Sequence, residues 1–425
     1  MSANAISTKL DGRYWKLAIA GGMASYLDSA AIISVGISLA IWQKAFGMDP
    51  WAVGFLSASL TFSIAIGALV GGRIADVLGR RPVFNTDLAL YVIGVATILM
   101  ASSQNMLIAG VIITGLAAGA DLPTSIAVIS ERAPKGGQGR MVAFTQVMWT
   151  IGIVVATLIG FMVAHLGMLG VKILFLHLIV VAVPTLLIRI FSRSFREMEE
   201  EAKDRNSADD TDIAVPLKTI LTTRKYLNGI VMTAAFYIFY GLVANTFGQF
   251  KTYFLVTVGD ASQATATGFS FCATLVGLAC ASLFTRAADT KWRNRLFYFG
   301  AILLVLGLSV AALSGGKILW IMLIVLIMYN LSNPFAGEAI YKVWTQEIFP
   351  VNARATAQGI TYAIARFVFA GFALVTPAII AWSPSGLFWM LVGLAIVSAV
   401  IGSLLIRANA GITASLTPMG KQQPA

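Results

Sequence analysis

Apolar residues run along this chain in long stretches that short polar segments interrupt. Twelve of these stretches reach the roughly 20 residues that a helix needs to cross a bilayer. They cover approximately residues 14–42, 51–74, 82–102, 106–130, 141–165, 172–190, 226–257, 263–285, 296–313, 318–346, 355–381 and 385–406. The pattern therefore predicts an all-α membrane protein with twelve transmembrane helices.

The longest polar segment separates the spans into two sets of six. It lies between the sixth and seventh spans and is rich in Glu and Asp. We therefore expect four parts: an N-terminal six-helix bundle at 1–190, a cytoplasmic linker at 191–225, a C-terminal six-helix bundle at 226–407 and a cytoplasmic tail at 408–425. Within the linker, one short amphipathic helix is compatible with the pattern.

Composition and charge agree with a membrane protein. Only 12% of the residues are charged and 58% are hydrophobic, whereas a soluble domain carries about 25% charged residues. The net charge of +11 does not indicate nucleic-acid binding, because the Lys and Arg residues lie at the ends of apolar runs and form no soluble basic face. Most of them lie on the side of the two termini, so the positive-inside rule predicts that both termini are cytoplasmic.

Two short motifs occur once in each half of the chain. Arg-x-Ala-Asp occurs at 73–76 and at 286–289, an offset of 213 residues. Glu-x-x-Pro occurs at 131–134 and at 347–350, an offset of 216 residues. Two motifs at nearly one offset indicate that the two bundles are pseudo-symmetric copies, an architecture common among secondary transporters.

With these motifs in place, the chain resembles the major facilitator superfamily and, within it, the sugar-porter branch. The resemblance rests on Gly-x-x-x-Asp-x-x-Gly-Arg-Arg at 72–81 and Glu-Ile-Phe-Pro-x-x-x-Arg at 347–354. Inside the membrane it rests on Tyr26 and Asp28 in the first span and on Gln146 in the fifth. It covers all twelve spans, and it implies alternating access with proton-coupled transport of a sugar or inositol.

The chain also departs from that branch. Gly110 is followed by Val111, where the branch usually has the Arg that partners the first-span Asp. The seventh span has Asn245, Gln249 and Tyr253 in partial replacement of the usual Gln-Gln…Asn pattern, and Lys342 stands where a Trp is usual. The first departure concerns the coupling pair, and the last two indicate a substrate unlike glucose.

The resemblance further implies that the charged turns form a conformational latch, which holds the two halves together in one state and releases them in the other. The alternative is that these charges only set the topology. The latch residues would be Gly72, Asp76, Gly79, Arg80, Arg81, Glu131, Arg140, Arg286, Asp289, Arg293, Glu347 and Arg354.

Ionisable side chains inside a membrane are costly and therefore mark candidate functional sites. Asp28 and Arg366 lie at similar depth, near the middle of the first and eleventh spans. Burial disfavours the charged form of a carboxylate and a nearby cation favours it, so an Asp that loses its cation in one state can take up a proton. Asp28 and Asp121 are the candidates for proton coupling. The alternative is a static ion network that only fixes helix packing.

Three further expectations concern the carboxylates in the spans. Glu338 and Lys342 are spaced i, i+4, so they share a helix face and can pair. Asp121 and Glu338 occupy near-equivalent positions in the two halves, and we expect both to face a central cavity. Asp87 lies shallow in its span, and we expect its side chain to reach the membrane surface.

Polar and aromatic side chains recur in the spans expected to line the cavity. Amides both donate and accept hydrogen bonds, which suits a ligand rich in hydroxyl groups. Asn333-Pro334 should also break the tenth span, because proline removes a helical hydrogen bond. The candidate substrate-binding residues are Gln146, Trp149, Asn245, Gln249, Tyr253, Asn330, Asn333, Glu338, Lys342, Trp344 and Arg366.

The sequence thus predicts a monomeric, multi-pass protein of the bacterial inner membrane that imports a small polyhydroxylated solute together with protons. An organic-anion symporter that binds a carboxylate through Lys342 and Arg366 is the alternative, and a nutrient sensor with the same fold is a third possibility. We expect no enzyme activity, no cofactor, no metal and no nucleic-acid partner, because no nucleophile–base pair, phosphate loop or metal cluster occurs at a recognisable spacing.

Overall fold

The N-terminal half is a bundle of six long helices. The structure, a computed structural model, describes residues 12–78, 80–132, 138–193, 197, 217–287, 290, 292–349 and 351–416, and its regular elements there are all helical. The helices of this half are α1 (Gly12–Phe46), α2 (Pro50–Leu78), α3 (Arg80–Leu99), α4 (Gln104–Arg132), α5 (Gln138–Met162), the 3₁₀ turn η1 (Ala164–Leu166) and α6 (Met168–Phe191).

The C-terminal half follows after the short helix α8 (Leu217–Thr222). Its helices are α9 (Arg224–Thr257), α10 (Gln263–Ala287), α11 (Arg293–Leu313), α12 (Leu319–Ala336), α13 (Glu338–Ile348), α14 (Val351–Trp382) and α15 (Pro384–Leu416). Across the described residues, twelve helical segments are long and apolar enough to cross a membrane. Each coincides with a run read from the sequence, so the prediction of twelve spans is confirmed.

The tenth span consists of two helices, α12 and α13. Pro334 lies inside α12, and the helix ends two residues later at Ala336. Gly337 then leaves the helical conformation, with φ −124° and ψ −140°, and α13 begins at Glu338. The expected break is therefore present, but it falls at Gly337. Pro334 weakens the ladder by removing one hydrogen bond, and the chain leaves the helix at the next glycine.

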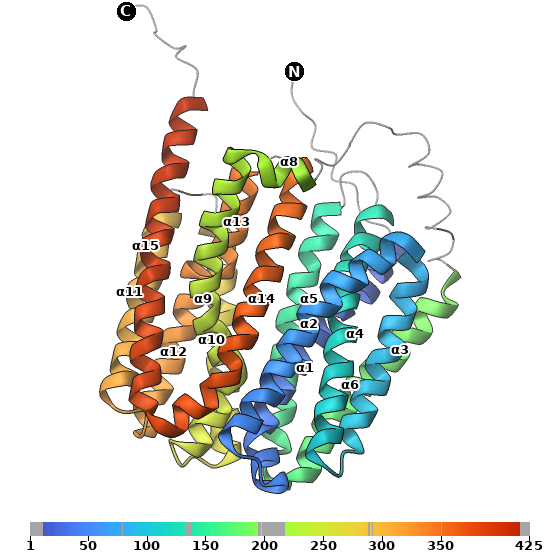
Figure 1. Cartoon of the computed structure of the whole chain (residues 1–425), viewed down its shortest axis with the longest axis vertical. Helices are drawn as coiled ribbons and strands as arrows, with labels where there is room; N and C mark the ends of the chain where they lie inside the picture. The colour runs from blue at the N-terminus through green and yellow to red at the C-terminus, as the bar shows by residue number, and fades with distance from the viewer. Residues whose placement is uncertain are drawn as a thin grey trace, which may run out of the picture.

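The two halves lie side by side and are joined most closely at the end away from the termini (Figure 1). The helix pairs that join them are α1 with α9, α2 with α14 and α5 with α10. A Cβ atom on Gly54 of α2 would lie 2.0 Å from the Leu374 carbonyl oxygen of α14. On α1, a Cβ atom at Gly36 would lie 2.5 Å from the Gln249 carbonyl oxygen. Glycine is thus required where these backbones meet.

The buried apolar side chains are distributed in the same way. One large cluster contains residues of both halves, such as Leu39 and Leu56 together with Phe250. Separate clusters lie around Phe84 in the N-terminal half and around Trp344 in the C-terminal half. The described core therefore has one region to which both halves contribute side chains, and other regions that each belong to a single half.

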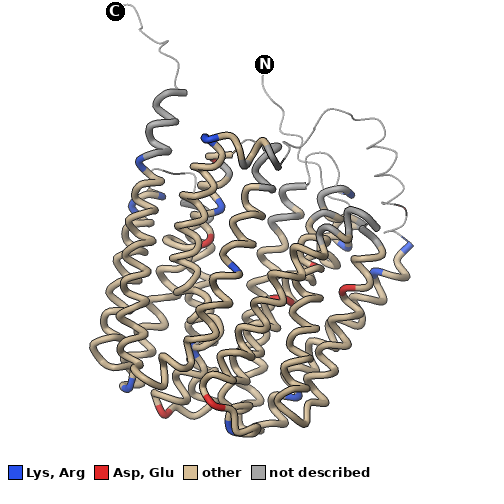
Figure 2. Tube along the Cα trace, in the orientation of Figure 1, with Lys and Arg blue, Asp and Glu red and all other residues tan. Residues whose placement is uncertain are grey.

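Charged residues gather at the two ends of the helices, with few between them (Figure 2). This distribution is expected of a protein whose middle layer lies in hydrocarbon, where a charge costs several kcal/mol unless it is paired. The few charged side chains of the middle layer are therefore the natural starting point for a functional site.

Candidate functional site

Asp28 and Arg366 form an ion pair between the two halves. The Arg366 guanidinium on α14 donates through Nη2 to Asp28 Oδ2 on α1 at 3.5 Å. The Asp28 side chain is fully buried, whereas that of Arg366 is 20% exposed. The second carboxylate oxygen, Asp28 Oδ1, is buried and has no hydrogen-bond partner among the described residues. The contact from Arg366 therefore leaves one of the two carboxylate oxygens of Asp28 without a hydrogen-bond partner among the described residues.

A second group of polar residues crosses between the halves closer to the termini. Lys342 lies 2.9 Å from Glu338 one helical turn away, as the i, i+4 spacing predicted. The Lys342 ammonium also donates to Gln146 Oε1 on α5 of the other half. Tyr362 on α14 donates to Glu338 Oε1 at 3.1 Å. The side chains of Lys342 and Glu338 are about one-third exposed, so a small solute can reach them.

A third contact between the halves is made by a buried amide. Gln249 on α9 accepts a hydrogen bond from Ser57 at 2.6 Å and donates to Thr61 at 2.7 Å, both on α2. It also donates to Asn245 Oδ1 at 3.0 Å. Because Gln249 is only 1% exposed, its side chain fastens the halves together in this arrangement and does not present a free amide to a solute.

Asp121 does not face Glu338 across a cavity as expected. Its carboxylate accepts two hydrogen bonds from Arg189 on α6, at 2.7 and 3.1 Å, inside the N-terminal half. Arg189 is 3% exposed and also donates to the backbone carbonyls of Phe84 on α3 and Ala20 on α1, at 2.8 and 3.1 Å. One guanidinium therefore joins four helices of one half.

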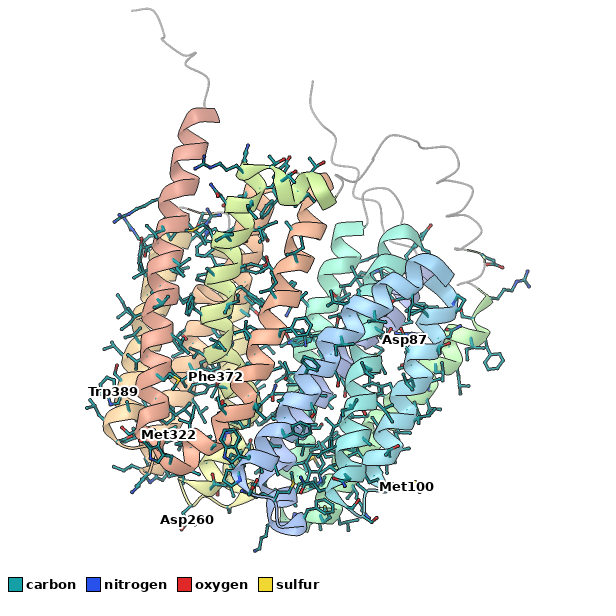
Figure 3. All side chains as sticks on the ribbon, in the orientation of Figure 1. Asp87, Met100, Asp260, Met322, Phe372 and Trp389 are labelled. Carbon is teal, nitrogen blue, oxygen red and sulfur yellow. The ribbon has the colours of Figure 1, made fainter. Side chains whose placement is uncertain are left out.

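Asp87 belongs to the same network and does not reach the membrane surface. Its side chain lies within the N-terminal half (Figure 3), is 4% exposed and approaches Arg189 to 3.9 Å. Asp87 Oδ2 is buried without a hydrogen-bond partner among the described residues. The expectation for Asp87 was wrong because Arg189, near the end of the neighbouring span, turns inward and compensates the carboxylates.

The remaining candidates for substrate binding contact other residues of the protein. Trp344 is fully buried and packs edge-on against Phe236 and Phe297 in the core of the C-terminal half. Asn333 accepts a hydrogen bond from Tyr240 of the same half. Asn330 donates to the Leu326 carbonyl of its own helix. Tyr253 packs against Phe250 and is hydrogen-bonded to Gln43 on α1 of the other half. The backbone carbonyl of Trp149 accepts a hydrogen bond from Ser29 on α1.

Of the expected latch, the structure describes the side chains of two residues. Arg293 donates to the Glu347 carboxylate at 2.6 and 3.4 Å, which joins α11 to α13 within the C-terminal half. The other members lie outside the residues whose side chains the structure describes: Gly72, Asp76, Gly79, Arg80, Arg81, Glu131, Arg140, Arg286, Asp289 and Arg354. Their role stays a prediction.

Sequence reasoning missed several participants in these groups. Arg189 was not singled out, although Asp87 and Asp121 in other spans were a signal that a buried cation was needed. Tyr362 lies four residues before Arg366, on the same helix face. Ser57 carried no signal, since a lone serine in a span is common.

Comparison with known proteins agrees with the fold. The family model of the Major Facilitator Superfamily matches residues 18–373. The minor myo-inositol transporter IolF of Bacillus subtilis is 31% identical over 416 residues, which cover 95% of this chain and 93% of that protein. The glucose transporter GlcP of Staphylococcus epidermidis is 24% identical and covers 80% of this chain and 81% of its own length.

A solved structure gives the same result for the architecture. The crystal structure of a D-xylose-proton symporter superposes with a TM-score of 0.73 at 17% identity, covering 91% of this chain and 96% of that one. The twelve helical spans, the two halves and the family match together show that this chain belongs to the Major Facilitator Superfamily of membrane transporters.

Proposed function

We propose that this protein is a proton-coupled importer of a small, uncharged polyhydroxylated solute such as myo-inositol or a monosaccharide. The similarity to a myo-inositol transporter over nearly the whole chain supports this class of substrate. The observation that carries the proposal is the charge balance at the contact between the halves, where each cation already has a carboxylate partner. Arg366 is paired with Asp28, and Lys342 is paired with Glu338. An organic anion would have to displace a carboxylate from either cation, whereas a neutral polyol leaves both pairs in place.

The group formed by Gln146, Lys342, Glu338 and Tyr362 is the best-supported place for such a solute. It combines an amide, an ammonium, a carboxylate and a phenol from both halves. Together these groups donate and accept hydrogen bonds in many directions, as vicinal hydroxyl groups require. Among the other candidates, Gln249 and Arg366 lie at contacts between the halves, and Asn245 accepts a hydrogen bond from Gln249 on its own helix. Trp344 is better explained as a packing residue.

Transport would proceed by alternating access, in which the two halves rock about a site near the midplane. The bundles at 1–190 and 226–407 would be the moving units, with the linker and the termini on the cytoplasmic side of a bacterial inner membrane. We assign proton coupling to Asp28, which is buried at the contact between the halves. Asp121 is a weaker candidate, because its partner Arg189 belongs to the same half and would move with it.

The contact between Gly54 and Leu374 gives a direct test of the rocking motion. Gly54→Trp should keep α2 and α14 apart and disfavour the arrangement described above. Overpacking costs about 1–3 kcal/mol, so we expect initial rates of myo-inositol uptake to fall roughly 5–150-fold. Gly371→Trp is the matched control, because a Cβ atom at Gly371 of α14 meets nothing within 4 Å. Equal uptake by the two variants would contradict the motion.

The substrate class is tested in proteoliposomes loaded with a pH-sensitive dye. Myo-inositol, xylose, glucose and small carboxylates are added one at a time to the outside, and protein-free liposomes serve as the control. We expect a polyol to acidify the lumen and the carboxylates to have no effect. Acidification by carboxylates alone would instead identify an anion symporter that uses Lys342 and Arg366, and it would refute the proposal.

A further inference from the structure

Among the described residues, Arg366 is the cation that reaches the buried Asp28 carboxylate, and it belongs to the other half. The two residues stand on α14 and α1, which belong to different moving units in the proposed cycle. The Asp28–Arg366 contact is long, at 3.5 Å, and uses one nitrogen and one oxygen. A pair of this kind depends on the relative position of the halves, because a small displacement of either helix is enough to break it.

The other charged and titratable groups around Asp28 do not replace Arg366. From α4, Asp121 faces it with the same charge, and from α6, Arg189 is occupied by Asp121. The Tyr91 hydroxyl on α3 donates to the Leu27 carbonyl, and Tyr26 belongs to α1 itself. Tyr253 on α9 is hydrogen-bonded to Gln43, about four turns along α1 from Asp28, and Lys251 lies two residues before Tyr253. Among the described residues, separation from Arg366 therefore leaves the Asp28 carboxylate without a cation.

We propose that Arg366 acts in proton coupling and not in substrate binding: it stabilises the ionised Asp28 while the halves stand as described, and its withdrawal allows Asp28 to bind a proton. This inference rests on the proposed function. An Arg side chain keeps its charge at every accessible pH, so the proton must reside on Asp28. A carboxylate that is buried and loses its cation favours the neutral, protonated form. Movement of the halves and proton binding to Asp28 are then coupled.

Accumulation and exchange of labelled myo-inositol separate coupling from binding. Proteoliposomes carry the wild type, Arg366→Gln or Lys342→Gln, with an inward pH gradient of about one unit and the membrane potential clamped. One proton per solute allows about tenfold accumulation. We expect the wild type to approach this ratio and Arg366→Gln to reach only about onefold, with exchange retained.

Lys342→Gln is the matched control, because Lys342 also lies at the contact between the halves, but its charge is paired with Glu338 on its own helix. We expect it to raise KM for myo-inositol and still to accumulate the solute. Accumulation by Arg366→Gln at the wild-type ratio would overturn the inference, as would a rise in KM with full coupling. If the wild type neither accumulates nor exchanges myo-inositol, the proposed function is refuted, and the inference about Arg366 that rests on it is refuted with it.

A second measurement needs no solute. The infrared band of the protonated Asp28 carboxyl is obtained as a difference spectrum, by subtracting the spectrum of a protein that also carries Asp28→Asn. The subtraction is made once in the wild-type background and once in the Arg366→Gln background. We expect the band to persist to higher pH in Arg366→Gln than in the wild type, because the stabilising cation is gone. A band that disappears at the same pH in both proteins would refute the role of Arg366.

The variants also control for folding. Arg366→Gln leaves a buried carboxylate without its cation, whereas Asp28→Asn with Arg366→Gln removes both charges. If the single variant cannot be purified, the double variant is expected to recover its fold and to exchange myo-inositol without accumulating it. A double variant that is no more stable than the single one, or that accumulates the solute, would count against the inter-half pair.

Discussion

Asp28→Asn is expected to reduce proton-driven accumulation of myo-inositol from about tenfold to about onefold at a gradient of one pH unit. The substitution preserves the shape of the side chain and removes the group that can bind a proton. Asp28 is 0% exposed, so the substitution leaves no carboxylate at this buried position. Exchange of myo-inositol across the membrane should continue, because it needs substrate binding and rocking of the halves but no net proton movement.

Asp260→Asn provides the matched control for this result. It makes the same chemical change in the exposed connection between α9 and α10 (Figure 3), at a residue with a positive φ of 49° that Asn tolerates. We expect wild-type accumulation from it. If Asp28→Asn also accumulated myo-inositol to the wild-type ratio, Asp28 would not carry the proton, and its pair with Arg366 would be a static contact.

The fold was accessible from the sequence because it depends on length and hydropathy. A bilayer of fixed thickness requires about 20 apolar residues per helix, and each of the twelve runs met that requirement. The broken tenth span was also predictable, since Pro334 cannot complete the hydrogen-bond ladder. The position of the break was less predictable, because the helix continued to Ala336 and ended where Gly337 allowed the chain to turn.

The candidate site was only partly predictable because a sequence gives the depth of a residue but not its direction around the helix axis. Asp28 and Arg366 were placed at one depth, and they do meet. Asp121 and Glu338 were also placed at equivalent depths, but Asp121 turns toward Arg189. Side-chain direction follows from how helices pack, and no local pattern distinguished a cavity-facing Trp344 from one in the core.

The buried network around Arg189 has a different role from the pair at Asp28, because all its members belong to one half. Arg189 bonds to Asp121 and to carbonyls on α1 and α3, and its guanidinium lies 3.7 Å from the centre of the Phe84 ring. Rocking of the halves leaves these contacts unchanged. The network therefore contributes to the rigidity of the N-terminal half.

Arg189→Gln should consequently lower stability far more than it alters coupling. Removing one partner of a buried ion pair costs about 3–5 kcal/mol, because the remaining charge stays buried without compensation. Here Asp121 would lose its cation while Asp87 remains 4% exposed nearby. The measurement is the thermal unfolding of the purified protein in detergent, and we expect a clear fall in the midpoint temperature.

Arg193→Gln is the matched control, four residues along the chain and just beyond the end of α6. The Arg193 side chain is 88% exposed and pairs with Glu197 one turn away. Such a surface pair contributes at most about 1 kcal/mol, so its loss should leave the midpoint nearly unchanged. Equal midpoints for the two variants would show that Arg189 does not hold the half together. Partial recovery of the midpoint in Arg189→Gln with Asp121→Asn would instead attribute the loss to the stranded carboxylate, because that double variant removes both members of the pair.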